Sequence, residues 1–128
     1  MTQPPAFAEA PLPLFQTDEA PPVAVPGGRL PSYIRDHRAR LRDRFRAGGA
    51  DALPDYELLE LVLFRAIPRQ DVKPLARGLL ETFGDFNGVV SAPIARLSSI
   101  KGVGDAVITE IKLVEAAAHR LARARVSA

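Results

Sequence analysis

The fold of this sequence is decided by the stretch IKGVG at residues 100–104, which joins two apolar-periodic segments at 91–99 and 105–125. Apolar residues recur at helical spacing in both segments, so the short connection predicts a hairpin of two helices. Two glycines one residue apart predict a turn with positive φ angles, which residues with a Cβ adopt only at a cost. Without side chains, the turn also lets the backbone of another molecule come close.

The backbone amides of this turn form a predicted anion site. Gly102, Val103, Gly104 and Asp105 place their N–H groups in the turn and at the positive end of the second helix. Such donors suit a phosphate, and the neighbouring Lys101 adds a formal charge. The residue types at 94, 97, 100 and 102–104 resemble the helix-hairpin-helix motif, which implies DNA contact through phosphate without base reading. Two alternatives stay open: an ordinary helical corner, and a capping carboxylate at Asp105 that competes for the donors.

Proline separates the chain into two parts. Seven of the twelve prolines fall within the first 26 residues, where no apolar periodicity survives. We expect residues 1–28 to form a disordered or polyproline-type arm, and residues 29–128 a helical domain with the hairpin at about 91–125. All 17 Lys and Arg residues and 12 of the 15 acidic residues lie from Arg29 onward, so the helical domain carries a net charge of +5 and the arm −3. This balance is compatible with a polyanionic partner but does not demand one.

Composition argues against several classes of protein. The chain has no cysteine, which excludes disulfides and thiolate chemistry and fits a reducing compartment. No basic residue precedes Arg29, and the apolar run at 12–15 is too short for a signal peptide. No uncharged apolar run approaches the roughly 20 residues of a membrane helix. We therefore expect a cytoplasmic protein without membrane contact.

The chain is predicted to be all-α, because nothing in it alternates like a strand for more than a few residues. We expect a small bundle of about five helices, with start and stop signals such as Ser32, Pro54, Asp71 and Gly84. The expected helices span 32–47, 54–66, 71–83, 91–99 and 105–125, with one further short turn within 85–90. The segment 54–66 is apolar almost all round and is predicted to be the central buried helix.

The first expected helix is rich in arginine, at positions 35, 38, 40, 42, 44 and 46. One interpretation is an electrostatic patch for nucleic-acid phosphates. Arg38, Arg42 and Arg46, together with Lys112 on the last helix, are then the candidates to support a phosphate chain held by the hairpin. The other interpretation is a solvated face with local pairs to two acidic neighbours. The sequence favours neither.

Five segments carry a resemblance to a known family: LPDYELLEL at 53–61, LFRAIPR at 63–69, KPLA at 73–76, FG at 83–84 and IKGVG at 100–104. In their order and spacing, the chain from about residue 38 to 123 resembles the N-terminal region of the RadC family, bacterial proteins long described as DNA repair proteins. The resemblance implies a helical domain that ends in one helix-hairpin-helix unit. The chain departs from the family pattern after the hairpin, where Ile108 and Thr109 stand at positions that more often carry small residues.

Members of that family normally continue into a second domain of the JAB metalloprotease type. This sequence stops before such a domain, so we interpret it as a truncated form of a longer protein, with a natural short form as the alternative. Its two histidines, His37 and His119, are far apart and have no spacing to a carboxylate that suits a metal. No Ser-His-Asp arrangement follows from spacing, and the acidic residues are scattered. The sequence therefore predicts no catalytic site, no metal site and no cofactor in this chain.

Two functions remain open from the sequence, beside a third interpretation as a plain helical bundle without a ligand. The first is a non-sequence-specific DNA-binding module, whose hairpin holds one phosphate of single-stranded, duplex or branched DNA. A lone hairpin binds weakly, so a second unit is expected from a homodimer or from the segment 56–83, whose connection lacks glycine and would not present amides. The second function is a protein-interaction or scaffold domain that positions the missing domain or a partner protein.

Overall fold

The computed structural model describes residues 30–127 and contains only helices within that range. The elements are α1 (Ser32–Gly48), a 3-10 turn η3 (Gly49–Asp51), α2 (Asp55–Ala66), α3 (Lys73–Phe83), α4 (Phe86–Val90), α5 (Ile94–Ser98) and α6 (Asp105–Ser127). The all-α prediction is confirmed, and the helix boundaries differ from the expected ones by a few residues. The expected arm at 1–28 lies outside the described residues. Between residues 30 and 127, no helix combines the length and apolar character needed to cross a bilayer.

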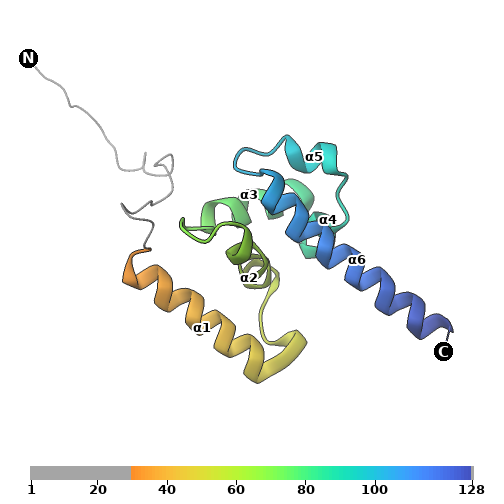
Figure 1. The fold of residues 1–128 in the computed structure, drawn as a ribbon, viewed down its shortest axis with the longest axis horizontal. Helices are drawn as coiled ribbons and strands as arrows, with labels where there is room; N and C mark the ends of the chain where they lie inside the picture. The colour runs from red at the N-terminus through yellow and green to blue at the C-terminus, as the bar shows by residue number, and fades with distance from the viewer. Residues whose placement is uncertain (1–29, 128) are drawn as a thin grey trace, which may run out of the picture.

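The helix α2 lies at the centre of the molecule (Figure 1). It packs against α1 on one side and α6 on the other, and against α3 and α4. Its residues Leu59 and Leu63 have no exposed surface, as the apolar character of 54–66 predicted. The core around α2 takes residues from every α-helix, among them Leu41, Leu53, Leu79, Val89, Leu97, Val107 and Ile111.

Local polar contacts fix the starts of α3 and α4, and of these only the contact at Asp71 was expected from the sequence. Asp71 Oδ1 accepts a hydrogen bond of 3.0 Å from the Lys73 amide at the start of α3. Asp85 caps α4 by accepting from the Gly88 amide at 2.7 Å. The prediction for Ser32 is wrong: Pro31 occupies the cap position of α1, and no side chain caps that helix. Proline supplies the extended backbone that precedes a helix, so the serine falls one residue inside it.

The centre of the fold contains a buried carboxyl group. Glu60 of α2 has no exposed surface, and its Oε1 lies 3.2 Å from His37 Nε2 on α1. Its other oxygen, Oε2, has no hydrogen-bond partner among the described residues, and neither does the hydroxyl of Tyr56, one turn away on α2. Burial raises the pKa of Glu60, and the hydrogen bond from His37 opposes that rise. Ionising this carboxyl group inside the core is therefore unfavourable.

We predict that the stability of the protein depends on pH through Glu60. Because the pKa of Glu60 is higher in the folded than in the unfolded chain, unfolding releases a proton. The free energy of unfolding should thus be highest below pH 4.5 as far as this group is concerned, and should fall as the pH rises through the folded-state pKa. Glu60→Gln keeps the shape and removes the charge, so it should abolish this fall.

Urea unfolding followed by circular dichroism between pH 4 and 8 measures this effect. Glu57→Gln is the matched control, because Glu57 lies on the same helix but pairs with Arg44 near the surface. The Glu57 variant should keep the pH slope of the wild-type protein. An unchanged slope in the Glu60 variant would contradict the assignment.

Candidate nucleic-acid interface

The turn between α5 and α6 is closed by a backbone hydrogen bond. The Val103 amide donates to the Ile100 carbonyl oxygen at 3.1 Å, and Gly102 within this turn has φ 95°. The expectation of a positive φ is therefore right at Gly102. It is wrong at Gly104, which is not among the glycines with a positive φ. By Gly104 the turn is complete, and this residue already accepts the first hydrogen bond of α6, from the Ile108 amide at 3.1 Å.

Apolar residues hold the hairpin on the core. Leu97 before the turn and Val107 after it are buried, and Ile100 and Val103 pack against the core between them. A Cβ at Gly102 would lie 3.5 Å from Leu75 Cδ1, so the turn rests directly on α3. These contacts fix the position of the turn relative to the bundle. Position 94 differs from the expected pattern, because Ile94 is 55% exposed.

The predicted donors Gly102, Gly104 and Asp105 donate no backbone hydrogen bond within residues 30–127, and neither does the amide of Lys101. The Val103 amide, predicted to be a fourth donor, is used inside the turn and has to be removed from the candidate site. The candidate anion site thus has three donors, two of which lie at the positive end of the 23-residue helix α6.

The surface at Gly104 is open. No heavy atom lies within 4 Å of the position that a Cβ would take there, and Lys101 at the tip of the turn is exposed. Asp105 is the first residue of α6, and in the described part of the chain its carboxylate accepts no hydrogen bond. The competing cap interaction is therefore not formed. A methyl group at position 104 would therefore enter open space.

One basic residue beside the hairpin was missed from the sequence. Arg96, on the helix that leads into the turn, places its guanidinium 4.8 Å from the ring centre of Phe83. Stacking on an aromatic ring limits the freedom of this exposed cation. The sequence could have indicated Arg96 as a candidate, because it lies four residues before Ile100 on the exposed side of a short helix.

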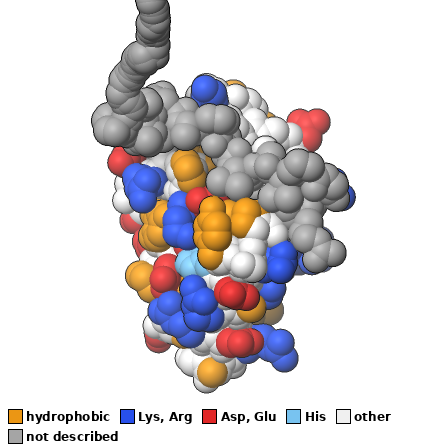
Figure 2. Space-filling model, turned by 90° about the vertical axis from the view of Figure 1, so that its left-hand side faces the viewer, with side chains coloured by type: hydrophobic (Ala, Val, Ile, Leu, Met, Phe, Trp, Pro, Cys, Tyr) orange, Lys and Arg blue, Asp and Glu red, His pale blue; other side chains and the backbone are white. Residues whose placement is uncertain are grey.

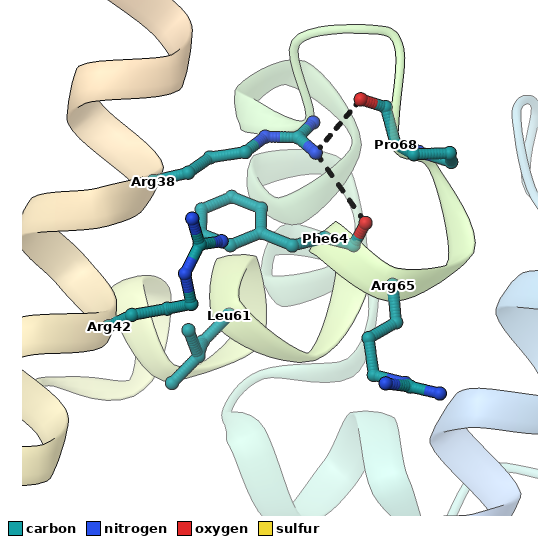
Figure 3. Close-up of a pocket in the computed structure, with 6 residues that line it drawn as sticks. All are labelled: Arg38, Arg42, Leu61, Phe64, Arg65 and Pro68. Atoms are coloured by element: carbon teal, nitrogen blue, oxygen red, sulfur yellow. Dashed lines mark hydrogen bonds between the residues drawn. The ribbon is translucent and has the colours of Figure 1, made fainter.

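The structure overturns the role expected for Arg38. This residue is 5% exposed, and its two terminal nitrogens donate to four carbonyl oxygens, those of Phe64 at 3.5 Å, Ile67 at 2.8 Å, Pro68 at 3.2 Å and Gln70 at 2.5 Å. Figure 3 shows the guanidinium reaching across the end of α2 toward two of them. The cation also lies 4.5 Å from the centre of the Phe64 ring. Arg38 therefore holds the α2–α3 connection and offers no charge to a ligand at the hairpin.

Arg42 and Arg46 are exposed on α1 but do not lie beside the hairpin. Arg42 lines a shallow groove of about 450 Å³ between α1 and the end of α2, with Leu61 and Phe64 on its floor (Figure 3). Burial lowers the pKa of Arg38, and the like charge of Arg42 lowers it further. The helix α1 lies across α2 from α6, so the arginines of α1 and the hairpin form separate surfaces (Figure 1).

Charges of both signs cover the α1 side of the molecule. Figure 2 shows acidic side chains lying among the basic ones on this face. One such pair is Arg44 with Glu57, at 2.9 Å between Nη2 and Oε1. This arrangement agrees better with a solvated helix face than with a continuous basic patch.

Lys112, like Arg38, has a structural role. Its Nζ donates to the carbonyl oxygens of Val90 at 3.1 Å and Ala92 at 2.5 Å, and pairs with Glu115 Oε1 at 3.0 Å. The ammonium group thus ties α6 to the connection between α4 and α5. The expectation that Lys112 supports a bound phosphate is corrected accordingly, because all three of its donors have acceptors.

Comparison with known proteins places this architecture in a family. Residues 35–109, which run from α1 through the hairpin into α6, match the family model described as UPF0758 N-terminal. The chain belongs to the UPF0758 family. It is 75% identical over 97 residues to UPF0758 protein SPO0054 of Ruegeria pomeroyi, covering 76% of this chain and 43% of the relative.

A second relative gives the same result. The chain is 69% identical over 86 residues to a UPF0758 protein of Rhodobacter capsulatus, covering 67% of this chain and 40% of the relative. The matches thus span less than half the length of these bacterial relatives. No solved structure matches the chain.

We predict that Arg38→Met lowers the free energy of unfolding by about 2–4 kcal/mol, because the end of α2 loses its charged donors. Arg46→Met is the matched control on an exposed position of the same helix, and should change stability by less than about 0.5 kcal/mol. Urea unfolding of both variants measures the difference. Equal effects of the two substitutions would refute the structural role of Arg38.

We also predict that the two glycines of the hairpin respond differently to alanine. Gly102→Ala should cost about 1–3 kcal/mol, because an L-residue at φ 95° is strained. Gly104→Ala should cost less than about 1 kcal/mol, the effect of replacing glycine at the start of a helix, because its Cβ enters open space. Thermal or urea unfolding distinguishes the two variants. A larger loss of stability in Gly104→Ala than in Gly102→Ala would contradict the positive φ angle assigned to Gly102.

Proposed function

We propose that this chain is the DNA-contacting N-terminal module of a RadC-like DNA repair or recombination protein in the bacterial cytoplasm. The hairpin holds a DNA phosphate through the amides of Gly102, Gly104 and Asp105, without reading bases. The observation that carries the proposal is the open surface at Gly104 beside unpaired amides at the start of a long helix. This assignment rests on the hairpin.

A phosphate suits this site better than other groups for two reasons. The N–H groups without acceptors at the turn and the dipole of α6 favour an anion with several acceptor oxygens. Exposed Lys101 in the turn and Arg96 on the preceding helix, stacked on Phe83, add positive charge near the site. The nearby carboxylate of Asp105 reduces the net attraction, so binding by a single hairpin should be weak and sensitive to salt.

The competing function is a scaffold domain that positions another domain or a protein partner. The exposed apolar residues of α6 favour this alternative, because they offer a surface for a helix rather than for a polyanion. The two functions predict different dependences of DNA affinity on salt and on Gly104. A scaffold that does not contact DNA should show neither dependence.

We expect the 128-residue chain to bind labelled single-stranded, duplex and branched DNA with a log–log salt slope corresponding to about 2–4 phosphates. Gly104→Ala should raise the dissociation constant by roughly tenfold, because the new methyl group occupies the approach to the amides. Lys101→Gln should reduce the salt slope by about one. Fluorescence anisotropy at several salt concentrations, on the order of 25 to 200 mM, measures the dissociation constant and its salt slope.

Gly78→Ala is the matched control for this experiment. Gly78 lies inside α3, and a Cβ there meets no atom within 4 Å, so the substitution is equally small but lies outside the hairpin. It should leave DNA affinity unchanged. Affinity that ignores Gly104 and Lys101, or no binding at low salt, would move the assignment to the scaffold function.

A further inference from the structure

The C-terminal half of α6 extends beyond the other helices. Val107 and Ile111 near the start of α6 are buried in the bundle, whereas all residues from Ala116 to Ser127 are exposed. Figure 1 shows this half of the helix projecting from the rest of the molecule. A projecting helix of 12 residues gains no stability from burial along this length, unless another element packs against it.

An apolar stripe runs along the outer side of this helix. Leu113 is 59% and Leu121 54% exposed, and Ala117 and Ala124 lie in the same row at helical spacing. This row lies on a different side of α6 from the buried Ile111. Two exposed leucines separated by small residues are typical of a helix face that packs closely against another helix.

The charges of α6 are unevenly distributed along its length. Its acidic residues lie in the first half, at 105, 110 and 115, together with Lys112, which pairs with Glu115, and its arginines lie in the second half, at 120, 123 and 125. Two copies of this helix in parallel would place like charges side by side. In the antiparallel arrangement the acidic half of one copy lies beside the basic half of the other.

We propose that two copies of this chain associate through an antiparallel pair of α6 helices centred on Ala117. In this register Leu113 of each copy lies opposite Leu121 of the other, and the alanines at 117 meet at the centre. Glu110 then lies beside Arg125 of the second copy. The two helical bundles then lie at opposite ends of the α6 pair. The projecting C-terminal half of α6 in one copy covers the outer face of the N-terminal half of α6 in the other copy.

Glu110 is partly covered by its own bundle, with a side chain that is 21% exposed. Its present partner is Arg65, at 3.6 Å, whose side chain is 80% exposed, so this pair contributes little and can be exchanged for another. The proposed interface is one helix pair, smaller than the roughly 1,600 Å² of a standard interface. We therefore expect a dissociation constant in the micromolar range, and an association that depends on protein concentration.

Sedimentation of the 128-residue chain over concentrations from about 1 to 500 μM, around the expected micromolar constant, tests the association. Leu121→Glu should weaken it at least tenfold, because a charge enters the apolar row. Val126→Glu is the matched control, since Val126 is 87% exposed on the same helix but lies outside the row. A monomer throughout the range, or equal effects of the two substitutions, would overturn the proposal.

A charge exchange tests the register. Arg125→Glu and Glu110→Arg should each weaken the dimer, and the double variant should restore it, because the pair reforms with reversed signs. The chain has no native cysteine, so single-cysteine variants at 110 and 124 add a second readout. Mixed under oxidising conditions, Glu110→Cys and Ala124→Cys should form disulfides mainly with each other. Disulfides only between identical variants would overturn the antiparallel pair.

Discussion

The fold depends on one buried cation at the end of its central helix. The guanidinium of Arg38 binds four carbonyl oxygens that α2 and the following loop leave without partners. Ile67-Pro68 ends α2, so this loop cannot satisfy its own carbonyl groups by continuing the helix. Beyond the loop, α3 begins at Lys73 and carries Leu75, which supports Gly102 of the hairpin. A residue of α1 thereby fixes the surface on which the distant turn rests.

The helices could be predicted from the sequence because apolar spacing and helix-ending residues act locally. Gly84 and the pair Ile67-Pro68 end their helices whatever the tertiary structure around them. The buried positions of Leu59 and Leu63 follow from the same spacing, since α2 has almost no polar face on which to remain exposed. These features needed no knowledge of which helix packs against which.

The roles of charged residues could not be predicted in this way. Six arginines on α1 look alike in the sequence, and only the path of the α2–α3 loop selects Arg38 for burial. Lys112 is likewise selected by the carbonyl groups that the α4–α5 connection presents. The turn between α5 and α6 could be predicted more closely, because glycine spacing constrains a turn directly. Its one false donor, Val103, is consumed by a hydrogen bond that depends on the exact turn type.

The length of α6 gives the molecule a fixed geometry. Its 23 residues form a continuous rod of about 35 Å, with the hairpin at one end. A rod of this kind acts as a ruler, because it fixes the distance and the direction between the hairpin and anything joined to its other end. Insertion of a single residue into the exposed half would lengthen the ruler by only about 1.5 Å but would turn its far end by about 100°. Direction, more than distance, is therefore what this helix specifies.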